Sequence, residues 1–590
     1  MYFKVEAYNG IAPVVSSRLL ADGMAQIAEN VVLNSGRAVP LRINSDIATL
    51  SGATRTSIWR YTPESTDYWL QWTENVDVVD GPLPKDAYDR VYFTGEDYPR
   101  VGSEASMIGG SSYPEASYRL GVPALTIPGN LSLTKAANNL DTETPNTVCY
   151  VFTYVTGFGE EGPPSAATAT IDLTDTQTDG STNQTLTIGN LPAAPTYSSG
   201  STFTSGHKMR IYRSNTGSNT TAFQFVAEST SFSGSYVDTK DGDELAEVIP
   251  STYWIGPPDD NSTTYPDGPM KGLVALPNGI LAGFTGRRLC FSEPYLPHAW
   301  PVSYRVTTED KIVALAMAGN TLLVATEGNP YVVGGVDPAS MQAVRLEAAQ
   351  ACVSKKSMVD MGDYAMYASP DGLVAVAGNE VQLVTEQLID PKDWLSTYNP
   401  TTIQGFLHEG TYVGFHSTGT NSRGGFIFDP RRGKNAFTTI TTTTTTEPNG
   451  GFYDPQEGQL YLIDDTATNR HIVKFQGSNT LATLKWKSKK FVTPRPTSLA
   501  WVSVTAEGYP FTVSVYAEGT LIYKGTVTES SGTKTLAVTT PSNISDIVPL
   551  PETVMRLPSN VAKEWEVEIE SQFNINELCL AESIDEIRGT

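Results

Sequence analysis

Side chains that could bind a metal or act as a nucleophile are few in this chain and stand far apart. The histidines are His207, His298, His408, His416 and His471, and no two of them form an HxH or HxxxH pair. Closely spaced ligands are the usual sequence sign of a zinc or iron site, so isolated core or surface histidines are the favoured interpretation. The chain has no GxSxG motif, and Cys149 lies within the apolar stretch TVCYVFTYVT, where a small buried hydrophobe is expected rather than a reactive thiol.

Two acidic motifs approach known kinds of site without completing them. SPDGLVAV, from Ser369, comes nearest to the Asp box of sialidase-type propellers, but its glycine falls one position early and the Thr-Trp pair is missing. A tight turn explains the proline and the glycine. DTQTDG, from Asp175, approaches a calcium loop, yet Gln177 takes the third ligand position and Leu186 the twelfth, where a glutamate is needed. We interpret this segment, and DTKDGDE from Asp238, as solvated loops. Among 64 acidic residues no carboxylate pair can be assigned to glycoside hydrolysis.

The charge balance argues against a nucleic-acid-binding groove. The chain carries 64 Asp and Glu against 40 Lys and Arg, a formal charge of −24, whereas phosphate binding needs clustered cations. The basic clusters are Arg287–Arg288, Arg431–Arg432 with Lys434, and Lys485, Lys487 and Lys489. The last three alternate around Trp486 and so share one face of a strand, where protection of a sheet edge is favoured over phosphate binding. Together with the missing motifs, this predicts a protein that is not an enzyme, with no catalytic residue, no cofactor and no metal.

The cysteines and the N-terminus indicate where the chain folds. Cys149, Cys290, Cys352 and Cys579 lie far apart without CxxC spacing, so no disulfide framework is expected. The N-terminus MYFKVEAYNG has no basic region followed by an apolar stretch, and no window approaches the ~18 apolar residues of a membrane span. We expect assembly in a cytoplasm and no membrane-spanning segment.

A strand-and-turn phrase recurs through the middle of the chain and indicates the architecture. Equivalent points of the phrase are Leu273, Ile312, Met358, Ile403 and Gly451, spaced 39, 46, 45 and 48 residues apart. Each unit has an apolar strand, a turn with Gly or Asn, and a second apolar strand. Such a period built from short strands is typical of β-propeller blades. One blade cannot bury both of its faces, so several must pack around an axis.

Composition divides the chain into five parts and predicts an all-β fold. Residues 1–50 form an N-terminal segment with a short helix around Ala21 to Asn30, where Met24, Ile27 and Ala28 share a face. Residues 51–130 hold the first propeller strands, 131–253 an inserted fibronectin-III or Ig-like β-sandwich, 254–493 the main blades, and 494–590 a C-terminal β-rich domain read as a β-sandwich. Strands from both ends of the chain would close the propeller ring and protect its edges.

Three segments resemble one family of viral proteins. SSRLLADGMAQIAENVVLNSGRAVPLR, ending at Arg42, is similar to the opening of tail nozzle proteins, or tail tubular protein B, of short-tailed bacteriophages. YVFTYVTGFGEEGPPS from Tyr150, with MRIYRS from Met209, resembles their fibronectin-like insertion. RLPSNVAKEWEVEIESQFNINELCLAESIDEI resembles their C-terminal segment. The segments are spread over nearly the whole chain and stand in the same order as in the family.

The resemblance implies a structural role in the virion. It implies a homo-oligomer, six subunits in this family, that forms the distal nozzle ring of the tail below a tail adaptor and beside the tail fibres. Double-stranded DNA would pass through without specific binding during ejection, and the family needs no catalytic residues. The same expectation follows from charge, because an acidic wall repels phosphates whereas a cationic wall would hold them.

Part of this acidic charge is expected to line a lumen, and the alternatives stay open. Glu564, Glu566, Glu568 and Glu570 are candidates for the lumen, although their alternation equally fits the wet face of an ordinary strand, which is favoured. The runner-up function is a carbohydrate- or receptor-binding β-propeller adhesin. A propeller hydrolase is a third alternative, against which the missing catalytic motifs weigh.

Overall fold

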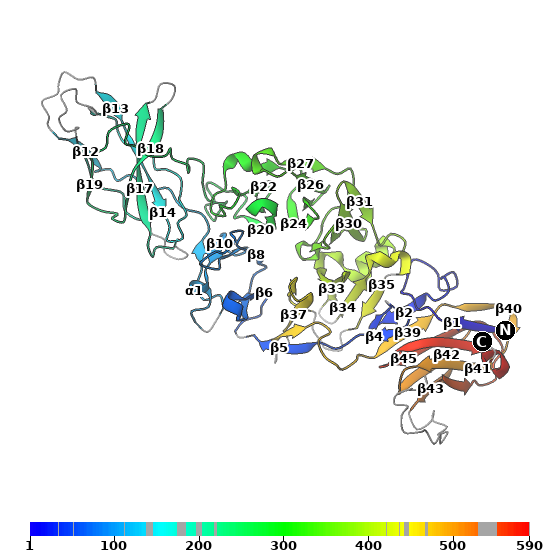
Figure 1. Cartoon of the computed structure of the whole chain (residues 1–590). Helices are drawn as coiled ribbons and strands as arrows, with labels where there is room; N and C mark the ends of the chain where they lie inside the picture. Colours follow the sequence, from blue (N-terminus) through cyan, green and yellow to red (C-terminus); the bar gives the residue numbers. More distant parts are fainter. Residues whose placement is uncertain are drawn as a thin grey trace.

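The computed structural model describes the chain apart from residues 34, 51, 111–112, 137–144, 174–184, 196–202, 217–220, 420–421, 436, 442–447, 466–469, 529–551 and 589–590. Its regular elements are almost all short β-strands, which confirms the predicted all-β fold. Figure 1 shows three regions in a row: the inserted sandwich at one end, a ring of small sheets in the middle, and the sheets that hold both chain termini at the other end.

Seven small sheets make the ring within the described residues. They are β6 (Ser57–Tyr61) with β7 (Tyr68–Trp72); β8 (Asp77–Asp80), β9 (Val91–Thr94), β10 (Arg100–Gly102) and β11 (Tyr118–Arg119); β20 (Lys271–Leu276), β21 (Ile280–Thr285), β22 (Arg288–Phe291) and β23 (Val306–Thr307); β24 (Ile312–Ala318), β25 (Thr321–Thr326), β26 (Tyr331–Gly334) and β27 (Gln342–Arg345); β28 (Val359–Asp360), β29 (Ala365–Ala368), β30 (Leu373–Ala377) and β31 (Glu380–Leu383); β32 (Gln404–His408), β33 (Thr411–Gly419), β34 (Ser422–Phe428) and β35 (Phe437–Ile440); and β36 (Gly451–Asp454), β37 (Gln459–Asp465), β38 (Arg470–Lys474) and β5 (Ser45–Thr49).

The first strands of these sheets follow one another around a centre. β8 contacts β20, β20 contacts β24, β24 contacts β28, β28 contacts β32, β32 contacts β36, and β36 contacts β6. A shared core of Tyr61, Trp72 and Phe93 joins β6 and β7 to the sheet of β8 and completes the circle. Inner strands that surround an axis are the arrangement of propeller blades, so the chain has a β-propeller core.

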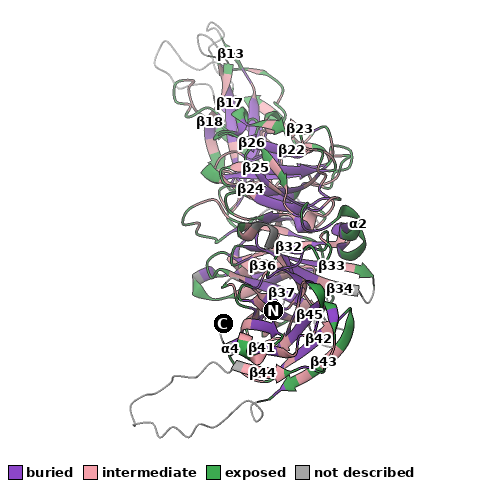
Figure 2. Ribbon diagram, turned by 90° about the vertical axis from the view of Figure 1, so that its right-hand side faces the viewer, coloured by how far each residue is buried: buried purple, intermediate pink, exposed green. Residues whose placement is uncertain are grey.

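Each pair of neighbouring blades buries its own hydrophobic core. Leu289 and Phe291 of β22, for example, pack against Leu322 and Val324 of β25, and equivalent clusters fill the spaces between the other blades. Figure 2 shows the buried residues concentrated along the strands of these sheets. A blade that is covered on both faces needs apolar residues on both, which explains why the repeats read as near-continuous apolar runs.

A strand from the N-terminal segment completes the last blade. β5 pairs antiparallel with β38, with Ala48 opposite Ile472, and it fills the outer position of the sheet that β36 to β38 begin. The expectation that strands from distant parts of the chain close the ring is confirmed. Pairing β5 in this way covers one edge that would otherwise be open.

The termini are held in two further sheets. One consists of β1 (Tyr2–Val5), β46 (Ile575–Ala581), β41 (Trp501–Ala506) and β44 (Glu552–Arg556). The other continues the blade of β32 to β35 through β2 (Ala25–Glu29), β39 (Leu484–Ser488), β45 (Ala562–Ser571), β42 (Phe511–Ala517) and β43 (Thr520–Val527), with β40 (Phe491–Thr497) also on β45. α4 (Ile584–Arg588) closes the described chain. No helix of the described residues has the length and apolar character that a membrane crossing needs.

The helix predicted around Ala21 to Asn30 is wrong, because this segment forms strand β2. Its residues Ala25 to Glu29 lie between β35 and β39, and Ala25 and Ala28 are buried. Met24, Ile27 and Ala28 share a helical face by spacing alone. Pairing with two strands from the far end of the chain outweighs that local pattern, as tertiary context commonly does.

The predicted parts also exchange elements at their borders. The segment 1–50 is no separate unit, since β1 and β2 join the terminal sheets and β5 joins the propeller. Residues 51–130 hold two propeller sheets, and β39 and β40, placed in the propeller by sequence, belong to the terminal sheets.

The insertion is a β-sandwich, as predicted. Its sheets are β12 (Ser132–Lys135), β16 (Leu186–Gly189) and β19 (Ser235–Asp238); β14 (Tyr150–Val155), β17 (Lys208–Thr216) and β18 (Thr221–Ser229); and the pair β13 (Asn146–Val148) and β15 (Ile171–Leu173). Phe152 and Ile211 from one sheet and Leu186 and Ile188 from the other meet in one buried core.

Candidate functional site at the propeller axis

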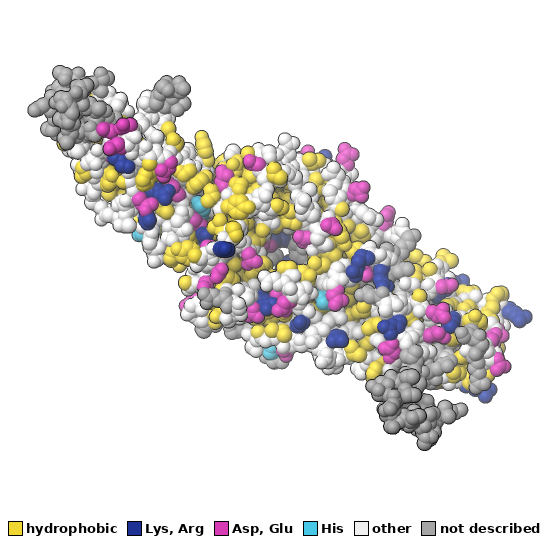
Figure 3. Space-filling view, viewed as in Figure 1, with side chains coloured by type: hydrophobic (Ala, Val, Ile, Leu, Met, Phe, Trp, Pro, Cys, Tyr) yellow, Lys and Arg dark blue, Asp and Glu magenta, His cyan; other side chains and the backbone are white. Residues whose placement is uncertain are grey.

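Elements of five blades converge on one cavity of about 180 Å³. Residues of β6, β8, β32 and β36 line it, together with η5 (Lys355–Ser357), a 3-10 turn that precedes β28. Because blades of a propeller meet only around its axis, a cavity that touches five of them lies on that axis. Figure 3 shows the surface hollowed near the middle of the ring.

One ion pair crosses this axis. Lys355 Nζ lies 2.5 Å from Asp77 Oδ2, and the Gly272 N–H donates to the same oxygen at 3.0 Å. Lys355 belongs to the blade of β28, Asp77 to that of β8 and Gly272 to that of β20. A single carboxylate therefore ties three blades together at the centre of the ring.

The neighbouring lysine, Lys356, contacts the blades of β36 and β6. Lys356 Nζ donates to the carbonyl oxygen of Asn449 at 2.8 Å and to that of Thr56 at 3.4 Å. Asn449 lies two residues before β36, and Thr56 directly precedes β6. Hydrogen bonds from a charged donor contribute more than neutral ones, so the two lysines stiffen the ring where its inner strands meet.

The size of the axial cavity limits what can pass. A volume of about 180 Å³ has room for about a dozen water molecules. A nucleic acid strand is far larger than this space, so any lumen for DNA would lie between subunits and not within one of them.

The four glutamates proposed for a lumen wall lie against a row of cations. They stand on β45, and Lys485, Lys487 and Lys490 of the adjacent β39 segment reach them. Lys487 Nζ lies 2.6 Å from Glu566 Oε2, and Lys490 Nζ lies 3.3 Å from Glu564 Oε2. Glu566 is 3% exposed and Glu568 is 8% exposed, so these two side chains face neither a lumen nor solvent, and both interpretations are wrong for them.

The basic clusters have partners as well. β39 lies between β2 and β45, so its lysines do not protect a sheet edge, and that interpretation is wrong. Arg431 Nε lies 2.8 Å from Asp429 Oδ1, and Arg432 Nε lies 3.5 Å from Asp429 Oδ2. Arg288 is 3.6 Å from Asp267. Arg288, Arg431 and Arg432 are thus each part of a local ion pair.

A buried group of charges fixes the insertion to the propeller. Arg90, just before β9, lies 2.7 Å from Asp86 and from Glu160 of the sandwich, and Glu160 Oε1 is 3.9 Å from His298 Nδ1. Burial raises the pKa of Glu160 to about 7 and lowers the pKa of His298 to about 4. The guanidinium of Arg90 also lies 5.0 Å from the Phe158 ring. We call these residues the joint.

The other candidate metal ligands remain apart. Burial lowers the pKa of His416 to about 4 and also lowers that of His408, while His207 Nδ1 is 2.9 Å from the Tyr154 hydroxyl. No group of three or more His, Cys, Asp or Glu residues within the described chain has metal-binding geometry. The four cysteines are free thiols, and Cys149, predicted to be buried, is only partly so.

The acidic motifs have structural explanations where they are described. In SPDG the Ser369 N–H donates to the Gly372 carbonyl at 2.8 Å, which makes the predicted tight turn between β29 and β30. Asp238 is not in a solvated loop, because Arg213 Nη1 contacts it at 2.9 Å and the Tyr150 hydroxyl donates to it at 2.7 Å inside the sandwich. All of DTQTDG, from Asp175 to Gly180, lies outside the described residues.

The axial lysines and the joint were not predicted from sequence. The paired Lys355–Lys356 directly before a repeat unit is the one signal that could have pointed to the axis. Nothing local marks Arg90 and Glu160 as partners, because they are 70 residues apart and belong to different domains.

Comparisons with known proteins add little to this geometry. No protein-family model matches the chain, and no curated protein matches it. Among solved structures, Hsv2 of Kluyvelomyces marxianus is similar with a TM-score of 0.22 and 8% identity, over 51% of this chain and 71% of that one. PorZ of Porphyromonas gingivalis, a bacterial surface component of the type-IX secretion system, has a TM-score of 0.24 and 11% identity, over 92% of this chain and 87% of that one. The assignment of the propeller rests on the strand pairing described above.

Proposed function

We propose that the chain is a structural virion protein, the subunit of the distal nozzle ring of a short phage tail. In this role it forms a homo-oligomer, expected to be a hexamer, that attaches to the tail adaptor, neighbours the tail fibres and surrounds DNA during ejection. It is not an enzyme, and it resides in the virion after assembly in the host cytoplasm.

One observation carries the proposal. The N-terminal and C-terminal segments that resemble nozzle proteins lie far apart in sequence, yet they form one unit, because β2 pairs through β39 with β45 and β1 pairs with β46. The third segment forms strands β14 and β17 of the inserted sandwich. The resemblance therefore covers both ends of the molecule in Figure 1, on either side of a propeller tied across its axis.

Charge supports the same role. A formal charge of −24 per subunit, repeated around a ring, repels phosphates and leaves duplex DNA free to move. Because the axial cavity of one subunit has room only for water molecules, the DNA conduit in this proposal is the space enclosed by several subunits.

The test is assembly of the full-length chain. We expect light scattering and negative-stain images of the chain, alone or mixed with the tail adaptor ring of the same virus, to show rings with a central opening. A gel-shift assay at about 50 mM salt should show no retention of duplex DNA by these rings. A chain that stays monomeric with the adaptor, or that binds duplex DNA tightly, contradicts the proposal.

A further inference from the structure

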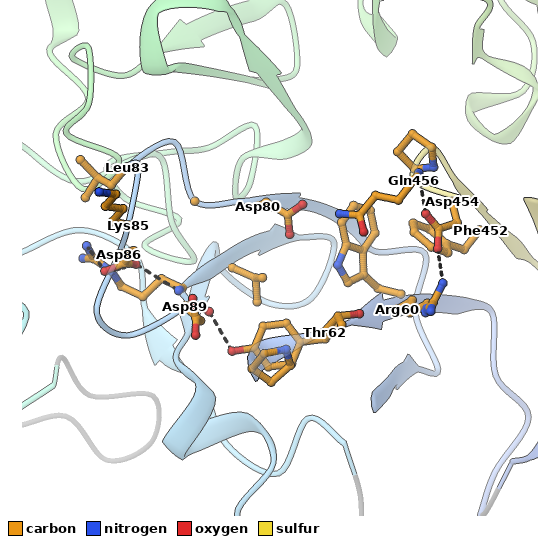
Figure 4. A pocket seen from close by; sticks show the side chains of 17 residues that line it. Arg60, Thr62, Asp80, Leu83, Lys85, Asp86, Asp89, Phe452, Asp454 and Gln456 are labelled. Atoms are coloured by element: carbon orange, nitrogen blue, oxygen red, sulfur yellow. Dashed lines mark hydrogen bonds and ion pairs between the residues drawn. The ribbon is translucent and has the colours of Figure 1, made fainter. Parts of the chain in front are cut away.

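A second cavity opens away from the axis. It has a volume of about 340 Å³ and lies between β6, the loop that follows β8, and the turn between β36 and β37. It shares no lining residue with the axial cavity. Its volume falls within the range of small-ligand pockets, and Figure 4 shows its side chains converging from these three elements.

Ion pairs hold the first wall of this pocket. Arg60 Nη1 lies 2.5 Å from Asp454 Oδ2 and 2.7 Å from Glu457 Oε1, and its Nη2 lies 2.8 Å from Asp67. Asp454 also accepts the Gln456 N–H at 2.8 Å. The turn between β36 and β37 is thereby fixed to β6.

The second wall is fixed by the joint. Asp86 accepts from the Arg90 backbone at 3.0 Å and from Arg90 Nε at 2.7 Å, which holds the loop between β8 and β9. Lys85 and Asp89 of this loop have positive φ values of 59° and 44° and both line the pocket. A pocket whose walls are already ordered loses little conformational entropy when a ligand binds.

An aromatic surface forms one side. The rings of Trp59 and Phe452 lie 4.7 Å apart at 56° to each other, and both side chains are half-buried. Trp59 Nε1 is covered by protein atoms, so the indole offers the pocket its apolar ring surface and not its N–H.

Asp80 supplies an acceptor in the same pocket. Figure 4 shows its carboxylate in the middle of the lining residues, with no interaction drawn to it. It is open to the pocket but surrounded by protein elsewhere, and this partial burial raises its pKa. The Arg60 and Arg90 cations nearby are already paired with other carboxylates. Asp80 is therefore available to accept hydrogen bonds from a ligand.

We propose that this pocket binds a neutral or amino sugar, whose ring packs on Trp59 and Phe452 and whose hydroxyls donate to Asp80. A sugar hydroxyl donates a hydrogen bond, so it suits a site that offers a carboxylate. The apolar face of a sugar ring suits the aromatic side. The lining carries four aspartates against the three cations Arg60, Lys85 and Arg90, so its formal charge disfavours acidic sugars and phosphates. A lysine side chain of a partner protein offers donors to Asp80 but no ring face to pack on Trp59 and Phe452.

The site is independent of ring assembly, since every residue in it belongs to one chain. The test uses the full-length protein and four probes: maltose, chitobiose, glucuronate and tetralysine. Tryptophan fluorescence and ligand-observed NMR report binding. We expect maltose or chitobiose to bind with a Kd below about 10 mM, and glucuronate and tetralysine to bind more weakly.

Matched variants assign the binding to this pocket. Asp80→Ala should weaken sugar binding by about tenfold or more, and Trp59→Phe by about threefold to tenfold, while far-UV circular dichroism shows that both variants stay folded. Asp363→Ala, at an exposed aspartate outside the pocket, should leave binding unchanged. The proposal fails if neither sugar binds below this Kd, if Asp80→Ala binds sugar normally, or if tetralysine or glucuronate binds more tightly through Asp80.

Discussion

Glu160 and His298 meet at the joint, and burial shifts their pKa values in opposite directions. Glu160 moves from 4.5 to about 7, so between these pH values the folded chain binds a proton that the unfolded chain has released. Its contribution to stability therefore falls as pH rises. His298 moves from 6.5 to about 4, so the unfolded chain binds the extra proton and stability rises with pH over that window. Between about pH 4.5 and 6.5 the two effects offset each other.

Removing either partner should expose the effect of the other. As pH increases from 4.5 to 6.5, we expect the Tm of wild type to change little. Over the same range we expect the Tm of Glu160→Gln to rise with pH and the Tm of His298→Gln to fall with pH. Between pH 4.5 and 6.5 each of the two shifts corresponds to about 2–3 kcal/mol of stability. Thermal unfolding across this range measures it, and parallel profiles for the three proteins would contradict the assignment.

The cations that face β45 permit a second test at the same scale. Lys487→Met leaves Glu566, which is 3% exposed, with only the more distant Lys490 at 3.5 Å, so we expect a loss of about 2–3 kcal/mol. Lys524→Met, at an exposed lysine on β43 of the same sheet, should change stability by less than about 0.5 kcal/mol. Urea unfolding compares them. If Lys487→Met/Glu566→Gln is no more stable than Lys487→Met, the loss does not come from the unpaired carboxylate.

At the scale of elements, sequence predicted what depends on local pattern and missed what depends on distant pairing. The alternation of Glu564 to Glu570 predicted a strand with one charged face, and β45 has it. The same alternation could not show that lysines 74 to 85 residues earlier would lie beside it. The helix wrongly predicted around Ala25 has the same cause. Two buried strands, β35 and β39, pair with β2, and neither is near it in sequence.

The strand β5 gives a direct test of ring closure. Leu50 donates its N–H to the Arg470 carbonyl at 2.8 Å. Backbone groups repeat every two residues along a strand, so the N–H of Ala48 also points toward β38, where Ala48 is opposite Ile472. Ala48→Pro removes that donor and should cost about 1–3 kcal/mol. Ile47 sits at the bulge in this pairing and has no partner residue in it, so Ile47→Pro should cost less.

Limited proteolysis and Tm compare the two proline variants. We expect faster cleavage near residue 50 in Ala48→Pro and a lower Tm than in Ile47→Pro. Equal behaviour of the two variants would show that pairing with β38 does not close the ring.

At the scale of the whole molecule, the repeat predicted a propeller but could not supply its number of blades. The five phrases from Leu273 to Gly451 each became a blade. Two more sheets come from residues 57–119, which precede the insertion and do not repeat the phrase. The binding pocket was also missed, because Trp59, Asp80 and Phe452 come from three blades and converge only when the ring closes.

The insertion is held to the propeller by aromatic packing around the joint. The rings of Phe158 and Phe203 stack at 4.6 Å, Tyr88 of the propeller lies 5.0 Å from Phe158, and its hydroxyl donates to the Gly157 carbonyl at 3.1 Å. Phe158 thus contacts both domains, whereas Phe232 packs within the sandwich. The orientation of the two domains depends on this small contact and not on a shared sheet.

Phe158→Ala should therefore free the sandwich without unfolding it. We expect small-angle X-ray scattering to show a broader distribution of distances and a larger radius of gyration, while far-UV circular dichroism and the main Tm stay unchanged. Phe232→Ala should do the reverse, lowering the stability of the sandwich by about 2–4 kcal/mol with the domain orientation preserved. If Phe158→Ala leaves the scattering curve unchanged, the ion pair between Arg90 and Glu160 is sufficient to orient the insertion. The double variant Phe158→Ala/Glu160→Gln then tests whether any orienting contact remains.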